Sequence, residues 1–95
     1  MDLALDITFH GRVQGVGFRY TSHELAQSFP DITGWVRNEL NGTVRMHLQG
    51  SEQILLSYLH LLTQESRMAH NINQMVKEPG TIDPQITDFR ITSLN

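Results

Sequence analysis

The chain has 95 residues and a mass of 10.9 kDa, a size with room for one hydrophobic core, so we expect a single domain over residues 1–95. Hydrophobic residues make up 39% and charged residues 18% of the chain, which excludes a disordered or fibrous protein. The net charge of −3 disfavours an extended basic surface, and the absence of cysteine excludes disulfides, thiolate nucleophiles and cysteine-bound metals.

The first third of the chain predicts a strand, a loop and a helix. Apolar residues occupy every second position from Leu3 to Phe9, as in a strand with one buried face. A loop punctuated by glycines follows over residues 11–17. Apolar side chains then recur at helical spacing over residues 18–29, and Pro30 ends this predicted helix.

A hairpin and a second helix are expected next. Residues 34–38 and 43–48 are short β-favouring runs, and the Asn41-Gly42 dipeptide between them is a strong hairpin signal. Ser51 is a plausible N-cap for a helix whose apolar stripe, at positions i, i+3, i+4 and i+7, runs over residues 55–62.

The last part of the chain completes an alternating pattern. Residues 69–76 predict a fourth strand and residues 89–91 a short fifth strand. The resulting order is βαββαβ plus a short C-terminal strand. Because crossovers between parallel strands are right-handed, this order predicts an α+β, ferredoxin-like split β-α-β fold with two helices packed on one face of a mainly antiparallel sheet.

The most informative segment is the loop between the first strand and the first helix, Gly11-Arg12-Val13-Gln14-Gly15-Val16-Gly17-Phe18-Arg19. A helix N-terminus offers unpaired N–H groups and a partial positive charge, and Gly15 and Gly17 let an anion approach the main chain. Arg19 can then hold two oxygens of a phosphate. A tight strand-to-helix turn with a solvated arginine accounts for the same spacing equally well. The segment lacks the third glycine of a dinucleotide fingerprint and the Gly-Lys-Ser/Thr of a P-loop.

Two motifs resemble those of a known family. The segment from Gly11 to Arg19 resembles the first acylphosphatase signature. The segment 34–38, followed by 42–44 and Gly50, resembles the second. The resemblance is close over residues 3–50, and it extends to residues 89–91 as a closing strand. It implies hydrolysis of the carboxyl-phosphate anhydride of small acyl phosphates, by in-line attack of water, to a carboxylate and inorganic phosphate. The family often has a Gly-Pro turn after the second helix. This chain has Gln64-Glu65-Ser66-Arg67-Met68 there instead.

The resemblance also implies a set of site residues. The substrate phosphate-binding loop consists of Gln14, Gly15, Val16, Gly17, Phe18 and Arg19. The resemblance implies that Arg19 and Asn38 are catalytic, with Arg19 holding the phosphate and Asn38 positioning the attacking water. Topology agrees, because parallel strands joined by a crossover end at the same sheet edge, so Asn38 near the end of its strand can face the loop.

We expect no metal and no cofactor. The leaving group is a carboxylate whose conjugate acid has a pKa near about 4.3, so it departs without protonation, and a loose transition state needs positioning and charge stabilisation. The five histidines show no metal-ligand spacing, and we expect them at surface or edge positions. Trp35 is expected to pack against its neighbours.

Other classes of protein fit less well. The predicted open sheet face carries no Phe or Tyr for base stacking, which disfavours RNA binding. No apolar run approaches the about 18 residues of a membrane span, and the N-terminal segment is acidic, unlike a signal peptide. We therefore expect a cytoplasmic monomer that binds a small acyl phosphate, without nucleic-acid or membrane partners. The alternative function is a non-catalytic regulatory module of the same fold that binds phosphate or an acyl phosphate.

Overall fold

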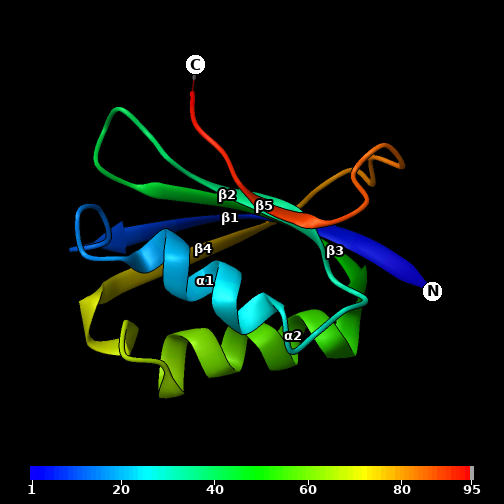
Figure 1. Cartoon of the computed structure of the whole chain (residues 1–95), viewed down its shortest axis with the longest axis horizontal. Helices are drawn as coiled ribbons and strands as arrows, with labels where there is room; N and C mark the ends of the chain where they lie inside the picture. The colour runs from blue at the N-terminus through cyan, green and yellow to red at the C-terminus, as the bar shows by residue number, and fades with distance from the viewer. Residues whose placement is uncertain (95) are drawn as a thin grey trace.

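A computed structural model describes residues 1–94, in which a twisted sheet carries two helices on one face (Figure 1). The strands and helices are β1 (Asp2–Gly11), α1 (Phe18–Ala26), β2 (Thr33–Asn38), β3 (Val44–Ser51), α2 (Glu52–His60), β4 (Ile72–Pro79) and β5 (Phe89–Ile91). A π-helical segment (Leu61–Glu65) and a 3-10 turn (Ala69–Asn71) connect α2 to β4. The strand order is β4-β1-β3-β2-β5, with β2 and β5 parallel and the other neighbours antiparallel. The predicted ferredoxin-like α+β fold is confirmed.

This topology determines which ends of the strands meet. Strand β3 lies between β1 and β2 and is antiparallel to both, so β1 and β2 run in the same direction. The loop that leaves β1 and the residue that ends β2, Asn38, therefore lie at the same end of the sheet. We call this end, formed by residues 11–19 and 38–43, the loop end.

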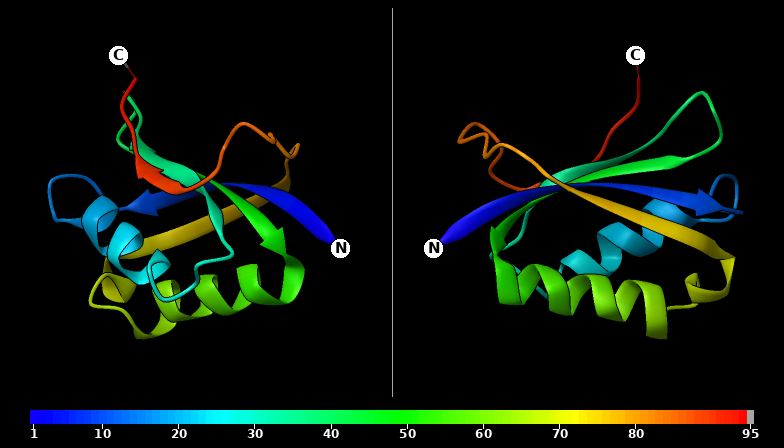
Figure 2. Two further views of the ribbon diagram at one scale, coloured as in Figure 1. Left: turned by 45° about the vertical axis from the view of Figure 1, so that its right-hand side comes forward. Right: turned by 180° about the vertical axis from the view of Figure 1, so that it is seen from behind.

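The hydrophobic core lies between the sheet and the helices, which cover the same face in both views of Figure 2. The predicted apolar stripe of α2 is buried in it, and Tyr58 is fully enclosed. The Tyr58 hydroxyl donates a 2.7 Å hydrogen bond to the Ser22 carbonyl of α1, and burial raises the pKa of the phenol. This bond joins the two helices, and Phe18 packs on Phe9 of β1 with 4.9 Å between ring centres.

Two predicted boundaries are wrong. Helix α1 ends at Ala26 rather than at Pro30, because its last N–H groups turn to i−3 acceptors, as in the 3.2 Å bond from Gln27 N to the Glu24 carbonyl. The fourth strand covers Ile72–Pro79 rather than residues 69–76. Residues 69–71 form a 3-10 turn that contacts the π-helical segment, and Asn71 bonds to Arg12 of the loop, so the strand begins only at Ile72.

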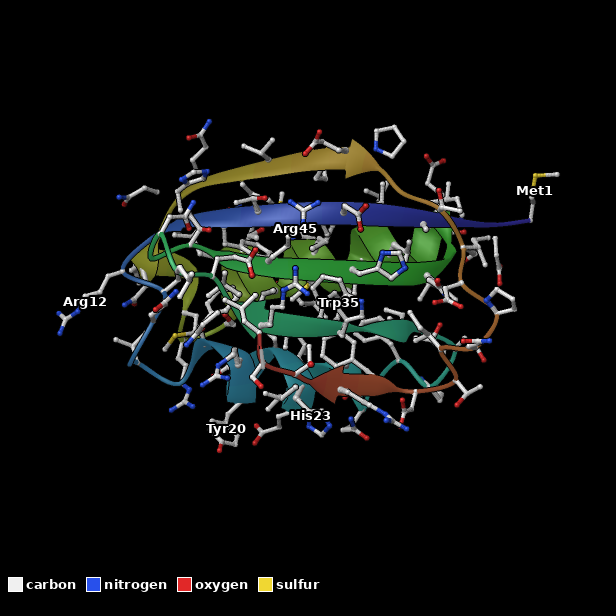
Figure 3. All side chains as sticks on the ribbon, turned by 90° about the horizontal axis from the view of Figure 1, so that it is seen from above. Met1, Arg12, Tyr20, His23, Trp35 and Arg45 are labelled. Atoms are coloured by element: carbon white, nitrogen blue, oxygen red, sulfur yellow. The ribbon has the colours of Figure 1, made fainter. Side chains whose placement is uncertain are left out.

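At the opposite end of the sheet, residues 80–88 cross from β4 to β5 (Figure 3). We call this connection the strap. Its residue Asp83 donates its main-chain N–H to Gln49 Oε1 (2.6 Å), and Gln49 Nε2 donates to the Asp83 carbonyl (3.1 Å). The strap is thereby attached to β3 on the face of the sheet that the helices leave open.

The histidine next to this attachment corrects another expectation. His47 is not at the surface, since only 6% of it is exposed. Its Nδ1 lies 2.6 Å from Asp6 Oδ1 and its Nε2 lies 2.9 Å from Gln49 Oε1. Trp35 stacks on the His47 ring, with 5.9 Å between centres, and the Arg37 guanidinium lies over the indole. The expectation that Trp35 packs against its neighbours is confirmed, although it does so on the open face.

Candidate active site

The loop begins at a break in the β1–β4 pairing, where the register shifts between His10 and Gly11. Arg12 N donates to the Asn71 carbonyl (2.9 Å), and Asn71 Nδ2 donates back to the Arg12 carbonyl (3.0 Å). Gly11 has φ = +131°, and a Cβ at this position would stand 2.2 Å from the Asn71 oxygen. A glycine is therefore required where the chain leaves the strand.

Two buried side chains hold the loop on either side of its exposed tip. Val13 and Phe18 are each 1% exposed, whereas Gly15 between them is exposed. Because the Phe18 ring is in the core, only its main chain can contact a ligand at the loop. The tip is thus a short segment anchored at both ends, with Gly15 exposed to solvent.

The loop end of α1 has the features of an anion site. Gly17 is the N-cap residue, with φ = +86°, and no side chain caps the helix. The first helical hydrogen bond runs from Thr21 N to the Gly17 carbonyl (2.9 Å), so the N–H groups of residues 18–20 have no partner within the helix. The first turn contains no acidic residue. These N–H groups and the positive end of the helix dipole favour a negatively charged ligand.

Gln14 connects this loop to the β2–β3 hairpin. Its Nε2 donates to the Glu39 carbonyl (2.7 Å) and to the Thr43 carbonyl (2.8 Å). Both hydrogen bonds that the Gln14 amide nitrogen donates are thus made within the protein. The Gln14 side chain therefore positions the hairpin. Only the main-chain N–H of Gln14 remains to bind an anion.

Asn38 ends β2 beside this connection. Its Oδ1 is buried and has no hydrogen-bond partner within residues 1–94. A buried acceptor without a partner costs about 1–3 kcal/mol unless another molecule donates a hydrogen bond to it. A water that donates to Asn38 Oδ1 would satisfy this atom.

One open pocket is shared by Gln14, Arg19 and Asn38. It has a volume of about 410 Å³, and its walls are formed by Gln14, Arg19, Asn38, Glu39, Leu40, Ser93 and Leu94. The structure therefore brings together Arg19 and Asn38, which are 19 positions apart in the sequence. The volume is within the range of small-molecule sites.

The charges around the pocket leave the Arg19 guanidinium available. Glu39, the acidic residue in the wall, accepts a 2.8 Å hydrogen bond from Arg37 Nε and forms an ion pair with it. The ion pairs described within residues 1–94 all involve side chains other than Arg19. Arg19 is only partly exposed, and it lines the pocket.

Several residues of this region were not identified from the sequence. Leu40, Ser93 and Leu94 line the pocket, and Arg67 approaches the N-terminus of α1 near Gly17 and Thr21. Leu40 is 97% exposed at the hairpin tip. An apolar residue in a hairpin turn was the one sequence signal that could have identified it as a pocket residue. The others depend on chain segments that come together only in the fold.

The described residues contain no cluster of three or more His, Asp or Glu side chains placed to hold a metal ion. Nor does any helix within residues 1–94 have both the length and the apolar character needed to cross a membrane.

Comparison with known proteins gives a consistent result. The Acylphosphatase family model matches residues 5–91. An acylphosphatase of Geobacillus kaustophilus is 38% identical over 90% of this chain and 88% of its own length, and one of Pseudothermotoga lettingae is 39% identical over 93% and 96%. The crystal structure of acylphosphatase from Bacillus subtilis superposes with a TM-score of 0.82 at 28% identity, covering 97% of this chain and 99% of that one.

Proposed function

This chain belongs to the acylphosphatase family and has acylphosphatase activity, and we propose that it hydrolyses small acyl phosphates in the pocket at the loop end. The observation that carries the location is the shared pocket of Arg19 and Asn38, beside a helix N-terminus whose N–H groups are unpaired. The family membership favours this enzyme over the regulatory phosphate-binding module.

In this proposal the phosphoryl group binds to the loop. The main-chain N–H groups from Gln14 to Arg19, with φ > 0 at Gly15 and Gly17, surround its oxygens. The Arg19 guanidinium donates two parallel hydrogen bonds to two of those oxygens. These donors stabilise the charge on the equatorial oxygens in the transition state, and in comparable sites one well-placed donor is worth about 3 kcal/mol.

Asn38 positions the nucleophile. Its Oδ1 accepts a hydrogen bond from a water, which orients a lone pair of the water oxygen toward phosphorus. The new bond forms between water oxygen and phosphorus while the bond from phosphorus to the carboxylate oxygen breaks. The electron pair of that bond stays on the carboxylate, and a proton of the attacking water passes to phosphate or solvent. No side chain needs to protonate the leaving group, because carboxylates are weak bases.

We also propose that the reaction needs no metal, and that residues 1–95 act as one domain and as a monomer in the cytoplasm, without nucleic-acid or membrane partners. The neutral amide of Asn38, Arg19 and the loop N–H groups together supply the positioning and charge stabilisation of this scheme.

The experiment is hydrolysis of benzoyl phosphate by the purified chain in the presence of EDTA. We expect full turnover with chelator and competitive inhibition by inorganic phosphate, because both ligands present the same tetrahedral oxygens to the loop. In an NMR titration, phosphate should shift the amide signals of residues 14–19. A loss of turnover that Mg²⁺ or Zn²⁺ restores, or noncompetitive inhibition, would contradict the proposal.

A further inference from the structure

Arg67 lies in the turn that follows the π-helical segment, outside both sequence motifs. The turn is held by Ser66, whose Oγ donates to the Leu62 carbonyl (2.6 Å) and accepts from Met68 N (3.1 Å). Met68 itself is buried, with 7% exposed. The backbone of Arg67 is therefore fixed between an internal hydrogen-bond pair and a core side chain.

From this turn the Arg67 side chain reaches the N-terminus of α1. Its Nε donates to Thr21 Oγ1 (3.0 Å). Its Nη2 lies 3.4 Å from the point where a Cβ on Gly17 would stand. Gly17 is the N-cap of α1, and Thr21 N closes the first turn on its carbonyl. The guanidinium thus lies against the turn whose free N–H groups point to the loop.

This is an unfavourable place for a cation in the unliganded protein. The N-terminus of a helix already carries about half a positive charge, and Arg19 adds a full one in the same turn. That turn has no acidic residue, and the ion pairs described within residues 1–94 do not include Arg67. In a chain with a net charge of −3, three of the seven basic residues, Arg12, Arg19 and Arg67, lie around one loop. A bound anion converts this repulsion into attraction.

We propose that Arg67 is a second arginine of the phosphate site, a positioning residue that attracts and retains the phosphoryl dianion without contacting the reacting atoms. The inference rests on the proposed binding of phosphate at residues 14–19. Because Arg67 interacts with the same dianion before and during the reaction, it strengthens binding and leaves the chemical step almost unchanged. Because Arg67 is exposed, its contribution is screened by salt.

The test is a charge series at this position, Arg67→Lys, Arg67→Met and Arg67→Glu, titrated with inorganic phosphate. At about 0.01 M salt we expect Arg67→Met to weaken phosphate binding about fivefold and Arg67→Glu about twentyfold, with Arg67→Lys close to wild type. At about 1 M salt, where the screening length is about 3 Å, the differences should fall below about twofold. KM for benzoyl phosphate should follow the same series while kcat stays constant. Arg90→Met is the matched control, since it removes a guanidinium on β5 that pairs with Asp88.

Thermal unfolding separates this role from a structural one. We expect Arg67→Met to be at least as stable as wild type without phosphate, because a cation is removed from a helix N-terminus, and to gain less stability when phosphate is added. If Arg67 serves only to brace Thr21, the variant unfolds at a lower temperature and binds phosphate with unchanged affinity, which overturns the proposal.

Arg19→Ala in the same titration distinguishes the two proposals. If Arg19→Ala binds phosphate as well as wild type, the proposed phosphate site is wrong, and the role of Arg67 fails with it. If Arg19→Ala loses binding while every Arg67 variant matches wild type at low salt, only the role of Arg67 is rejected.

Discussion

The two ends of the sheet differ in whether their polar groups have hydrogen-bond partners. At the strap end, His47, Gln49, Asp6 and Asp83 use their hydrogen-bonding groups on one another, with distances of 2.6–3.1 Å. At the loop end, Asn38 Oδ1 is buried without a partner within residues 1–94, and the first N–H groups of α1 have none in the helix. Satisfied polar groups stabilise a fold, whereas unsatisfied ones lower stability and favour a ligand. From this contrast we infer that the strap end contributes stability and propose that the loop end contributes binding.

The comparison predicts its largest effect at Arg19. Arg19→Ala should lower kcat/KM for benzoyl phosphate by about 10³-fold, because a bidentate donor to the transition state is lost, and should weaken phosphate inhibition as well. Arg19→Lys should recover little of this, since an ammonium cannot reproduce the two parallel hydrogen bonds. Steady-state kinetics with phosphate as inhibitor measure both quantities. Near-normal activity of Arg19→Ala would remove the basis for placing the reaction at the loop end.

Asn38 should show a different pattern. Asn38→Ala is expected to reduce kcat by about 10²-fold while the inhibition constant of phosphate stays within about twofold of wild type, because the amide contacts water and not the anion. Its unfolding free energy should not fall, since the removed acceptor has no partner to lose. Asn73→Ala, on an exposed position of β4, is the control. Loss of phosphate binding in Asn38→Ala would show that the two roles are not separate.

Gln49 should give the reverse result, with stability lost and activity kept. Gln49→Leu has nearly the same volume but leaves His47 Nε2 and the Asp83 main-chain N–H without their partner. It also removes one of the two hydrogen bonds to the Asp83 carbonyl, which keeps the bond from Ile86 N. We expect a loss of about 2 kcal/mol in unfolding free energy, or about 10 °C in Tm, with kcat at 25 °C unchanged. Denaturant unfolding measures the loss, and Gln53→Leu on the exposed side of α2 is the matched control. If Gln49→Leu keeps full stability, the strap end does not have the role given to it.

The smallest effect is expected from the hydrogen bond between the helices. Tyr58→Phe removes the 2.7 Å bond to the Ser22 carbonyl and should cost about 1 kcal/mol near pH 7. The folded-state pKa of Tyr58 is raised, so above about pH 10 the phenol ionises in the unfolded chain before it does so in the folded one, and wild-type stability falls with rising pH. The variant has no phenol at this position, so its stability lacks this dependence on pH. The stability difference between the two proteins should therefore narrow above pH 10, as unfolding titrations at pH 7–11 can test.

Local sequence patterns predicted most of the elements, because period-2 and period-3.6 spacing reflect neighbours along the chain. The Asn41-Gly42 turn and the Ser51 N-cap are both observed, the latter through the 3.3 Å bond from Ile54 N. The patterns failed where tertiary packing sets a boundary, as at the 3-10 turn before Ile72. His47 was misplaced for the same reason, since the strap that attaches at Gln49 crosses the sheet from a distant part of the chain.

The sequence by itself determined the alternating order of strands and helices and the place of the glycines in the loop, and through its motifs it predicted Arg19 and Asn38 as site residues. Only the tertiary structure decided that Gln14 links the loop to the hairpin, that Asn38 Oδ1 is buried without a partner within residues 1–94, and that Arg67 meets the first turn of α1. The physical reason is the separation in sequence between the residues that interact. Motifs and periodicity record interactions over a few residues. The hydrogen bonds and charges at a site instead depend on distant segments that meet only when the core has formed, 46 positions apart for Arg67 and Thr21 and 59 for Asn71 and Arg12.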